Sequence, residues 1–329
     1  MNILVTGGAG YIGSHTCKAL HDQGHTPVAY DNLTYGHPWA VKWGPFERGD
    51  VADTAKVLET LKKYGCEAVV HFAAFSYVGE SVQKPDVYYK NNVGGTLSLL
   101  LAMNEAAVKN IVFSSTCATF GGPITIPMNE KHPQNPISPY GRTKLIIEQM
   151  LKDFTTSLGF SAAILRYFNA AGADPSCDIG EDHDPETHLI PIALKMAAEG
   201  KGAVTIFGDD YDTPDGTCVR DYIHVTDLAN AHIAALDYIR NHKVRGLYDD
   251  FNLGNGKGFS VKEVISRAEK ITGKVIRQTI GPRRPGDPPV LVGDSRKAEE
   301  KLGWKTAYSN LDTIIETAWK WHLKHQNQR

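Results

Sequence analysis

The sequence has few cysteines, and they form no regular pattern. The five cysteines are odd in number and far apart, and no C-x-x-C pair occurs among them. Disulfide frameworks and cysteine-based zinc sites both need paired or regularly spaced cysteines. The sequence therefore argues against both kinds of site and indicates a reducing compartment.

Charge of one sign and long apolar runs are also lacking. Lysine and arginine total 35 against 37 aspartates and glutamates, which gives a formal net charge of −2. Such a balance gives no net positive electrostatic potential that would attract nucleic acid or an anionic membrane. No apolar run approaches the ~20 residues of a bilayer-spanning helix, and a strand pattern follows Met1 at once, where a signal peptide would lie. We therefore expect a cytoplasmic protein that binds neither nucleic acid nor membranes.

The sequence does show an alternation of short apolar runs and helical segments. Strands are predicted at 2–6, 26–30, 45–47, 68–72, 110–115 and 161–166. Alternation of this kind is typical of an α/β protein with a doubly wound parallel sheet, covered by helices on both faces. After residue 168, loops that contain Pro and Gly separate shorter elements. We predict a first domain at 1–168 and a smaller, loop-rich domain at 169–329, with 217–245 as the segment where the chain could return to the first domain.

The first strand leads into a glycine loop. Residues 6–13 read Thr-Gly-Gly-Ala-Gly-Tyr-Ile-Gly, and a helical pattern follows to Gln23. Glycines let the backbone approach a pyrophosphate, and the positive start of a helix supplies its counter-charge, although a tight turn without a ligand is the alternative. Asp31 ends the second strand where a carboxylate would receive ribose hydroxyls, and no arginine follows to hold a 2′-phosphate. The pattern predicts a Rossmann-type domain that binds NAD rather than NADP.

Hydroxyl side chains mark a second candidate site. The fifth strand ends in Ser114-Ser115-Thr116, at the carboxyl end where open α/β sheets bind ligands. Pro139 opens the next helix, and a spacing of four places Tyr140 and Lys144 on one face. A tyrosine base near neutral pH needs its pKa of about 10 lowered by roughly 3 units, which an ammonium about 4 Å away could supply. We therefore predict that Lys144 lowers the pKa of Tyr140 and that Thr116 relays the proton.

Together these motifs resemble the extended short-chain dehydrogenase/reductase superfamily. Five further segments resemble its UDP-glucose 4-epimerase family, and the likeness extends over nearly the whole chain: VGESV (78–82), LRYFN (165–169), GTCVRDYIH (216–224), FNLG (251–254) and RPGD (284–287). The resemblance implies that NAD stays bound while hydride leaves C4 of a UDP-hexose. Hydride then returns to the other face of the 4-keto sugar, so that UDP-galactose and UDP-glucose interconvert without net oxidation.

The resemblance also implies roles for individual residues, with Thr116, Tyr140 and Lys144 catalytic. Tyr140 and Lys144 would also contact NAD, together with Gly7, Gly10, Tyr11, Ile12, Gly13, Asp31, Asn32, Asp50, Val51, Phe72, Ala73, Ala74, Ser76, Asn91 and Phe168. Thr116 and Tyr140 would also contact the substrate, together with Asn169, His188, Arg220, Arg284, Asp287 and Leu291. The two arginines suit a diphosphate because a guanidinium donates two parallel hydrogen bonds. No metal ion is expected.

Three residues depart from, or vary within, the family pattern. Ser76 stands where some members place a lysine near the cofactor ribose, so NAD could be held less tightly. His188 occupies a position that is often asparagine at the diphosphate, and it can still donate a hydrogen bond. Leu291 lies where the size of the sugar-pocket wall varies, which leaves the acceptance of N-acetylated sugars undecided.

Two other features invite a functional interpretation that the sequence does not favour. The acidic and histidine-containing stretch 181–188 could suggest a metal site, but a solvated turn is the simpler interpretation. Cys117 lies beside the relay residue, but no histidine base is near it in sequence. We expect Cys117 to be a small space-filling residue.

Three alternative functions remain open from the sequence. A UDP-xylose/UDP-arabinose 4-epimerase would share every motif above. A nucleotide-sugar 4,6-dehydratase would need carboxylates directly after Thr116, where Cys117 and Ala118 stand. A non-catalytic NAD-sensing protein would commonly have lost Tyr140 or Lys144. The resemblance further implies a homodimer joined through the helices that follow Pro85 and Pro139.

Overall fold

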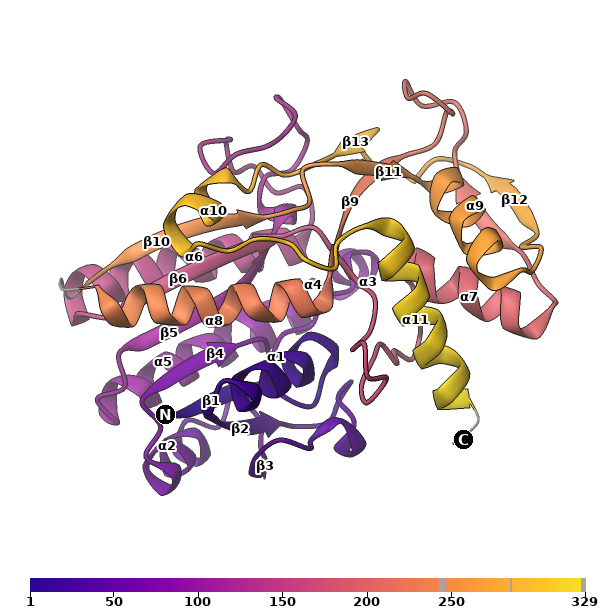
Figure 1. Ribbon diagram of the computed structural model, residues 1–329. Helices are drawn as coiled ribbons and strands as arrows, with labels where there is room; N and C mark the ends of the chain where they lie inside the picture. Colours follow the sequence, from indigo (N-terminus) through magenta and orange to yellow (C-terminus); the bar gives the residue numbers. More distant parts are fainter. Residues whose placement is uncertain (243–245, 285, 327–329) are drawn as a thin grey trace.

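The structure is a computed structural model that describes residues 1–242, 246–284 and 286–326. Pro285 of the RPGD segment, residues 243–245 of the predicted crossing segment and the last three residues lie outside the described residues. Figure 1 shows a broad layered body at one side, which carries the N-terminus, and a smaller group of helices at the other, near the C-terminus.

A parallel sheet of seven strands forms the centre of the larger body. Its order is β10-β6-β5-β4-β1-β2-β3. The strands are β1 (Asn2–Thr6), β2 (Thr26–Asp31), β3 (Phe46–Arg48), β4 (Ala68–His71), β5 (Asn110–Thr116), β6 (Ser161–Tyr167) and β10 (Tyr248–Leu253). All six predicted strands are present, with ends that differ from the prediction by at most one residue. Because the chain winds outward from β1 in both directions, the prediction of a doubly wound Rossmann-type sheet is confirmed.

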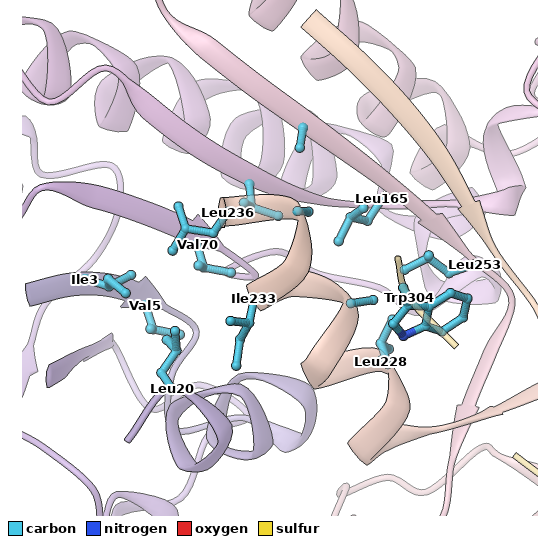
Figure 2. Packing of buried hydrophobic residues seen from close by; sticks show 14 of the residues in the cluster. Ile3, Val5, Leu20, Val70, Leu165, Leu228, Ile233, Leu236, Leu253 and Trp304 are labelled. Carbon is cyan, nitrogen blue, oxygen red and sulfur yellow. The ribbon is translucent and has the colours of Figure 1, made fainter. Parts of the chain in front are cut away.

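Helices cover both faces of this sheet. One face carries α1 (Tyr11–Asp22), α8 (Val225–Asn241) and α10 (Arg296–Leu302), and the other carries α2 (Thr54–Tyr64), α5 (Gly95–Glu105) and α6 (Pro139–Leu158). Figure 2 shows Val5 and Val70 of the sheet facing Leu20 of α1 and Ile233 of α8. Successive strand residues point to opposite faces, and both faces of the central strands are buried.

The smaller group is built from shorter elements. Its helices are α7 (Leu189–Glu199), α9 (Val261–Thr272) and α11 (Leu311–Gln326), and its strands are β7 (Asn169–Ala171), β8 (Val204–Phe207), β9 (Val219–His224), β11 (Gly258–Ser260), β12 (Gln278–Gly281) and β13 (Val290–Leu291). The helices share a core with Val204 and Ile206 of β8. After β9 the chain returns to the large sheet through α8 and β10. The boundary at residue 168 stays a prediction.

Short helical segments lie in the connections that follow the carboxyl ends of β2, β4 and β5. They are η1 (Pro38–Ala40), α3 (Val78–Gln83), α4 (Pro85–Tyr88), the π-helix η2 (Tyr89–Gly94) and η3 (Cys117–Thr119). Among the described residues, no helix combines the length and the apolar character that crossing a bilayer would need.

Candidate active site

The glycine loop between β1 and α1 has the shape of a phosphate cradle. Gly7 adopts a φ of 72°, and a Cβ on it would lie 2.8 Å from the backbone nitrogen of Ala73. A Cβ on Gly13 would lie 2.1 Å from the carbonyl oxygen of Gly7. Gly10 is the N-cap of α1, so the first N–H groups of the helix, from Tyr11 onward, open toward this loop. Since side chains are excluded and donors converge, these residues fit a pyrophosphate.

Three predicted cofactor residues lie together at the ends of β2 and β3. Asp31 accepts hydrogen bonds from the backbone nitrogens of Ala9 (3.1 Å) and Leu33 (2.8 Å). The Asn32 amide donates to Asp50 over 3.0 Å. Burial raises the pKa of Asp31, and the two backbone hydrogen bonds oppose that shift. Asp31 therefore joins the glycine loop to the ribose side of the predicted cofactor site.

Further cofactor candidates lie after β3, after β4 and within η2. Phe72, Ala73 and Ala74 are half-buried, Ser76 is exposed, and Val51 is buried. Asn91 donates to its neighbour Asn92 over 2.9 Å. Asn92, which the sequence analysis did not single out, is fully buried, accepts from the Phe75 backbone nitrogen and donates to Thr143. It holds the 75–76 loop against the helix that carries Tyr140.

The three predicted catalytic residues come together where β5 ends and α6 begins. Thr116 is the last residue of β5, and its side chain acts to lower the pKa of Tyr140, against the effect of burial. Ser138 caps α6 by accepting from the Gly141 backbone nitrogen, with Pro139 in the first turn. Lys144 lies one turn after Tyr140 and donates to the Ser114 carbonyl over 2.8 Å. All three side chains are buried.

The prediction that Lys144 lowers the pKa of Tyr140 is wrong for the chain by itself. The Lys144 ammonium lies 6.0 Å from the centre of the Tyr140 ring, because it turns toward the Ser114 carbonyl. Burial raises the pKa of Tyr140 well above its usual value, with Tyr167 adding to the shift and Thr116 opposing it. Burial also lowers the pKa of Lys144 to about 7, while Glu148 opposes that shift.

Behind this site lies a buried charge network that sequence reasoning missed. Glu148, one turn after Lys144, accepts from Ser115 over 2.5 Å and from Arg166 over 2.7 Å. Arg166 also pairs with Asp250 of β10 over 2.8 Å. The side chains of Glu148 and Arg166 are only 2% and 3% exposed, so neither charge is screened by water. In the sequence, the spacing of four residues from Lys144 to Glu148 could have indicated that Glu148 lies on the same face of the helix as Lys144.

The predicted substrate residues fall into two groups. Arg220 of β9 pairs with Asp287, and its guanidinium also donates to the Val219 carbonyl over 2.8 Å. Arg284 is exposed and stacks over the Phe207 ring at 4.0 Å. The structure thus brings Arg220 to the predicted ribose ligand Asp287, while Arg284 lies against β8.

An apolar wall stands next to Thr116. Phe168 packs with Phe120 and Met128, and Cys117 and Leu291 pack against this cluster. A Cβ on Gly293 would lie 2.3 Å from the Phe168 ring, so a glycine is needed there. Burial raises the pKa of Cys117 to about 12, which disfavours a reactive thiolate, and the space-filling role stays a prediction.

Asn169 is the first residue of β7, and its side chain donates to the Asp221 carbonyl of the neighbouring strand β9 over 2.9 Å. The fully buried Asp221 carboxylate accepts from the backbone nitrogens of Asn255, Gly256 and Gly293. Sequence reasoning quoted Asp221 within a motif but gave it no role. Asp221 therefore joins the loop of Asn255 and Gly256 to Gly293, the residue that lies close against the Phe168 ring.

His188 is the N-cap of α7, and its Nδ1 lies 2.8 Å from both Glu181 and Glu186. The solvated turn predicted for 181–188 is correct for Asp184 and Thr187, which are exposed. It is wrong for Glu181, whose side chain is 7% exposed because the loop folds back on Tyr11 and α11.

Comparisons with known proteins agree with this geometry. Residues 3–254 match the model of the NAD dependent epimerase/dehydratase family. A curated UDP-glucose 4-epimerase of Halalkalibacterium halodurans is 52% identical over 325 residues, which cover 99% of this chain and 96% of that protein. The solved UDP-glucose 4-epimerase of Brucella ovis in complex with NAD has a TM-score of 0.94 and 53% identity, over 97% of each chain.

A second solved structure includes a sugar nucleotide. It is the UDP-glucose 4-epimerase of Stenotrophomonas maltophila with bound NAD and formylated UDP-arabinopyranose, with a TM-score of 0.96 and 40% identity over 100% of both chains. The family match extends from the glycine loop to β10, and both structural likenesses extend over nearly the whole chain. This chain therefore belongs to the NAD dependent epimerase/dehydratase family.

Proposed function

We propose that this chain interconverts UDP-glucose and UDP-galactose by epimerisation at C4, with NAD as a bound cofactor that is regenerated in each cycle. The observation that carries the proposal is the convergence of Thr116, Tyr140 and Lys144 at one strand end, beside a glycine loop shaped for a pyrophosphate. The relatives of about 50% identity over nearly the full length, which are named UDP-glucose 4-epimerases, support it.

The cofactor would lie along the carboxyl ends of the strands. Gly7, Gly10 and Gly13, with the N–H groups of Tyr11 and Ile12, would hold the pyrophosphate, and Asp31 the adenosine ribose. The other cofactor contacts would come from Asn32, Asp50, Val51, Phe72, Ala73, Ala74, Ser76, Asn91 and Phe168. In this assignment the region 1–168 supplies most of the cofactor site.

The chemistry assigned to the chain is proton transfer. Thr116 would pass the proton of the C4 hydroxyl to Tyr140, and Lys144 would hold a positive charge near both. Bound NAD⁺ supplies a hydride acceptor and a positive ring that stabilises the phenolate. When the sugar has turned over, Tyr140 would return the proton as hydride returns to the opposite face of C4.

The UDP moiety would bind mainly to the region 169–329. Arg220 and Arg284 would hold the diphosphate, helped by Asn169 and by a hydrogen bond from His188. Asp287 would take ribose hydroxyls, and its ion pair with Arg220 supports the assignment because both side chains would then face the same UDP moiety. Leu291, against the Phe168 cluster, would form the sugar-side wall.

The first test is to incubate the purified protein with UDP-galactose and no added cofactor, and to follow UDP-glucose and NADH absorbance together. We expect UDP-glucose without net NADH, because hydride returns in the same cycle. Activity that requires added NAD would still support epimerisation, and it would mean that the protein holds NAD only loosely. A 6-deoxy-4-keto product would instead mean a dehydratase, and no turnover of any nucleotide sugar would favour a non-catalytic NAD sensor.

A pentose substrate is the closest alternative. It is favoured by the formylated UDP-arabinopyranose bound to the relative of 40% identity. The comparison of kcat/KM for UDP-galactose and UDP-xylose decides between them. We expect the hexose to be preferred, and a higher kcat/KM for UDP-xylose would move the assignment to UDP-xylose/UDP-arabinose epimerisation.

We further propose that the protein is a cytoplasmic homodimer joined through the helices that follow Pro85 and Pro139. Apolar side chains on α5 support this, since Leu97 and Leu101 are 42% and 50% exposed. We expect light scattering to give a dimer mass, and Leu101→Glu to give a monomer. Leu323→Glu, at a similarly exposed position of α11, is the matched control. A monomeric mass for the unmodified protein would contradict the proposal.

A further inference from the structure

The loop between β7 and α7 gathers four side chains of the metal-binding kind. They are Glu181, His183, Glu186 and His188. One nitrogen or oxygen donor atom from each lies within 4.8 Å of the others. In the sequence these residues form a short acidic stretch, and only the fold shows that their donor atoms converge.

Hydrogen bonds and ion pairs hold the donor atoms close together. Oε1 of Glu181 lies 3.0 Å from Nδ1 of His183 and 2.8 Å from Nδ1 of His188. The oxygens of Glu186 lie 2.8 Å from Nδ1 of His188 and 3.8 Å from Nδ1 of His183. A tetrahedral zinc ion with bonds of ~2.0–2.2 Å places neighbouring donors ~3.3–3.6 Å apart. The four observed separations lie on both sides of that range, so small side-chain rotations are sufficient.

The loop that carries these donors is anchored on both sides. Trp321 of α11 donates to the Glu181 carbonyl over 3.0 Å, and Tyr77 donates to the Pro185 carbonyl over 3.1 Å. The His183 ring meets Tyr11 of the glycine loop edge-on, with ring centres 6.1 Å apart. The Glu181 side chain is 7% exposed and that of His183 is 21% exposed. Binding an ion here would therefore cost little ordering of the chain.

The donor set identifies the class of ion. Once a metal ion has displaced the protons that His183 and His188 share with the carboxylates, two neutral imidazoles and two carboxylates balance the charge of a divalent cation. Imidazole nitrogens favour zinc and its transition-metal neighbours over magnesium or calcium, which prefer oxygen ligands alone. We propose that Glu181, His183, Glu186 and His188 bind one divalent transition-metal ion of the zinc class.

The ion would fasten the 181–188 loop against the glycine loop. Coordination through Nδ1 would also leave the proton of His188 on Nε2, the nitrogen that remains for a phosphate oxygen. This last consequence rests on the proposed function, whereas metal binding itself does not.

Metal content is the first measurement. The full-length protein is stripped with a chelator, incubated with Zn²⁺, dialysed, and analysed by mass spectrometry of the bound metal. We expect one zinc ion per chain, and at least tenfold weaker binding for His183→Gln and Glu181→Gln. His21→Gln, which removes an exposed histidine of α1, is the matched control and should bind as the unmodified protein does. No retained zinc, or equal binding by all variants, would overturn the proposal.

A second readout does not depend on the variants folding. Co²⁺ in place of Zn²⁺ gives intense visible absorbance when it is tetrahedral and only weak absorbance when it is octahedral. We expect the intense spectrum for the unmodified protein, with saturation at one equivalent. A weak spectrum would overturn the four-coordinate site of the zinc class. These measurements need no sugar nucleotide, so their failure would leave the proposed epimerisation untouched.

Discussion

Tyr140 and Lys144 are both buried, and burial moves their pKa values in opposite directions. The phenol is harder to ionise than free tyrosine, and the ammonium loses its proton at about pH 7. Each shift favours the neutral form of its group, because a charge is costly away from water. A phenolate in this site therefore depends on nearby positive charge.

Removal of the Tyr140 hydroxyl tests its role directly. We expect Tyr140→Phe to lower kcat for epimerisation by ~10²–10⁴, the usual contribution of a positioned acid or base. Its ring remains, so the thermal unfolding midpoint should change little. Thr116→Ser keeps a hydroxyl at the end of β5 and should retain most of the activity. Turnover of Tyr140→Phe at the unmodified rate would contradict the assignment.

Glu148 is a second residue whose replacement has a clear expectation. Glu148→Gln removes a buried negative charge and leaves Arg166 with Asp250 as its remaining ion-pair partner. We expect a loss of about 3–5 kcal/mol in the free energy of unfolding, measured by urea denaturation. Asp312→Asn, in an ion pair that is about half exposed on both sides, should cost less than about 1 kcal/mol. Equal losses for the two variants would mean that the buried pair is not special.

Sequence reasoning at this scale succeeded where residues lie close along the chain. The placement of Tyr140 and Lys144 on one face of a helix follows from their spacing alone. The distance from the ammonium to the phenol did not follow, because it depends on the Ser114 carbonyl, which a different element supplies. The Glu148 to Arg166 pair was missed for the same reason.

Helix starts are the element-scale feature that positions the chemistry. Ser138 accepts from the Gly141 backbone nitrogen over 3.1 Å, one residue after Tyr140. We expect Ser138→Ala to cost about 1 kcal/mol of stability and to lower kcat, because the first turn of α6 holds Tyr140. Asn310→Ala removes the equivalent hydrogen bond, over 2.9 Å, at the start of α11. It should cost similar stability with kcat unchanged, and a kcat loss in both variants would point to a general effect of stability.

Strands of the large sheet were predictable because each is a local apolar run between turns. The pairing of β8 with β12 was not, since it joins segments more than seventy residues apart in the chain. The π-helix η2 gave no signal either, although it carries Asn91 and Asn92. Its irregular turn is fixed by hydrogen bonds from Asn92 to Phe75 and Thr143, which only the assembled fold provides.

For the whole molecule, four buried histidines lower stability in acid, and the raised pKa of the buried Asp221 opposes them in part. Burial lowers the pKa values of His15, His224 and His232 to about 4 and that of His71 to about 3. The unfolded chain takes up these protons near pH 6.5, before the folded chain does. Because the unfolded state then binds more protons, stability falls as the pH decreases from about 6.5 toward 4.

This acid response can be measured by urea denaturation at several pH values. In that window, the slope of the unfolding free energy against pH reports how many more protons the unfolded chain binds than the folded chain. We expect His232→Gln to reduce this difference by up to one proton. His25→Gln, which removes a histidine outside the core, should keep more of the slope. An unchanged slope for His232→Gln would mean that another group controls acid unfolding.

The return of the chain to the large sheet has a consequence for protein synthesis. β10 forms the edge of the sheet beside β6, although the smaller group of elements begins between them in the chain. A nascent chain that has just emerged as far as Tyr167 therefore presents β6 as an unpaired edge, and α1 lacks the cover of α8. Such an edge is a template for pairing with other chains. The ribosome must deliver residues up to Leu253 before that edge is closed, so the edge of β6 stays open to other chains throughout this interval.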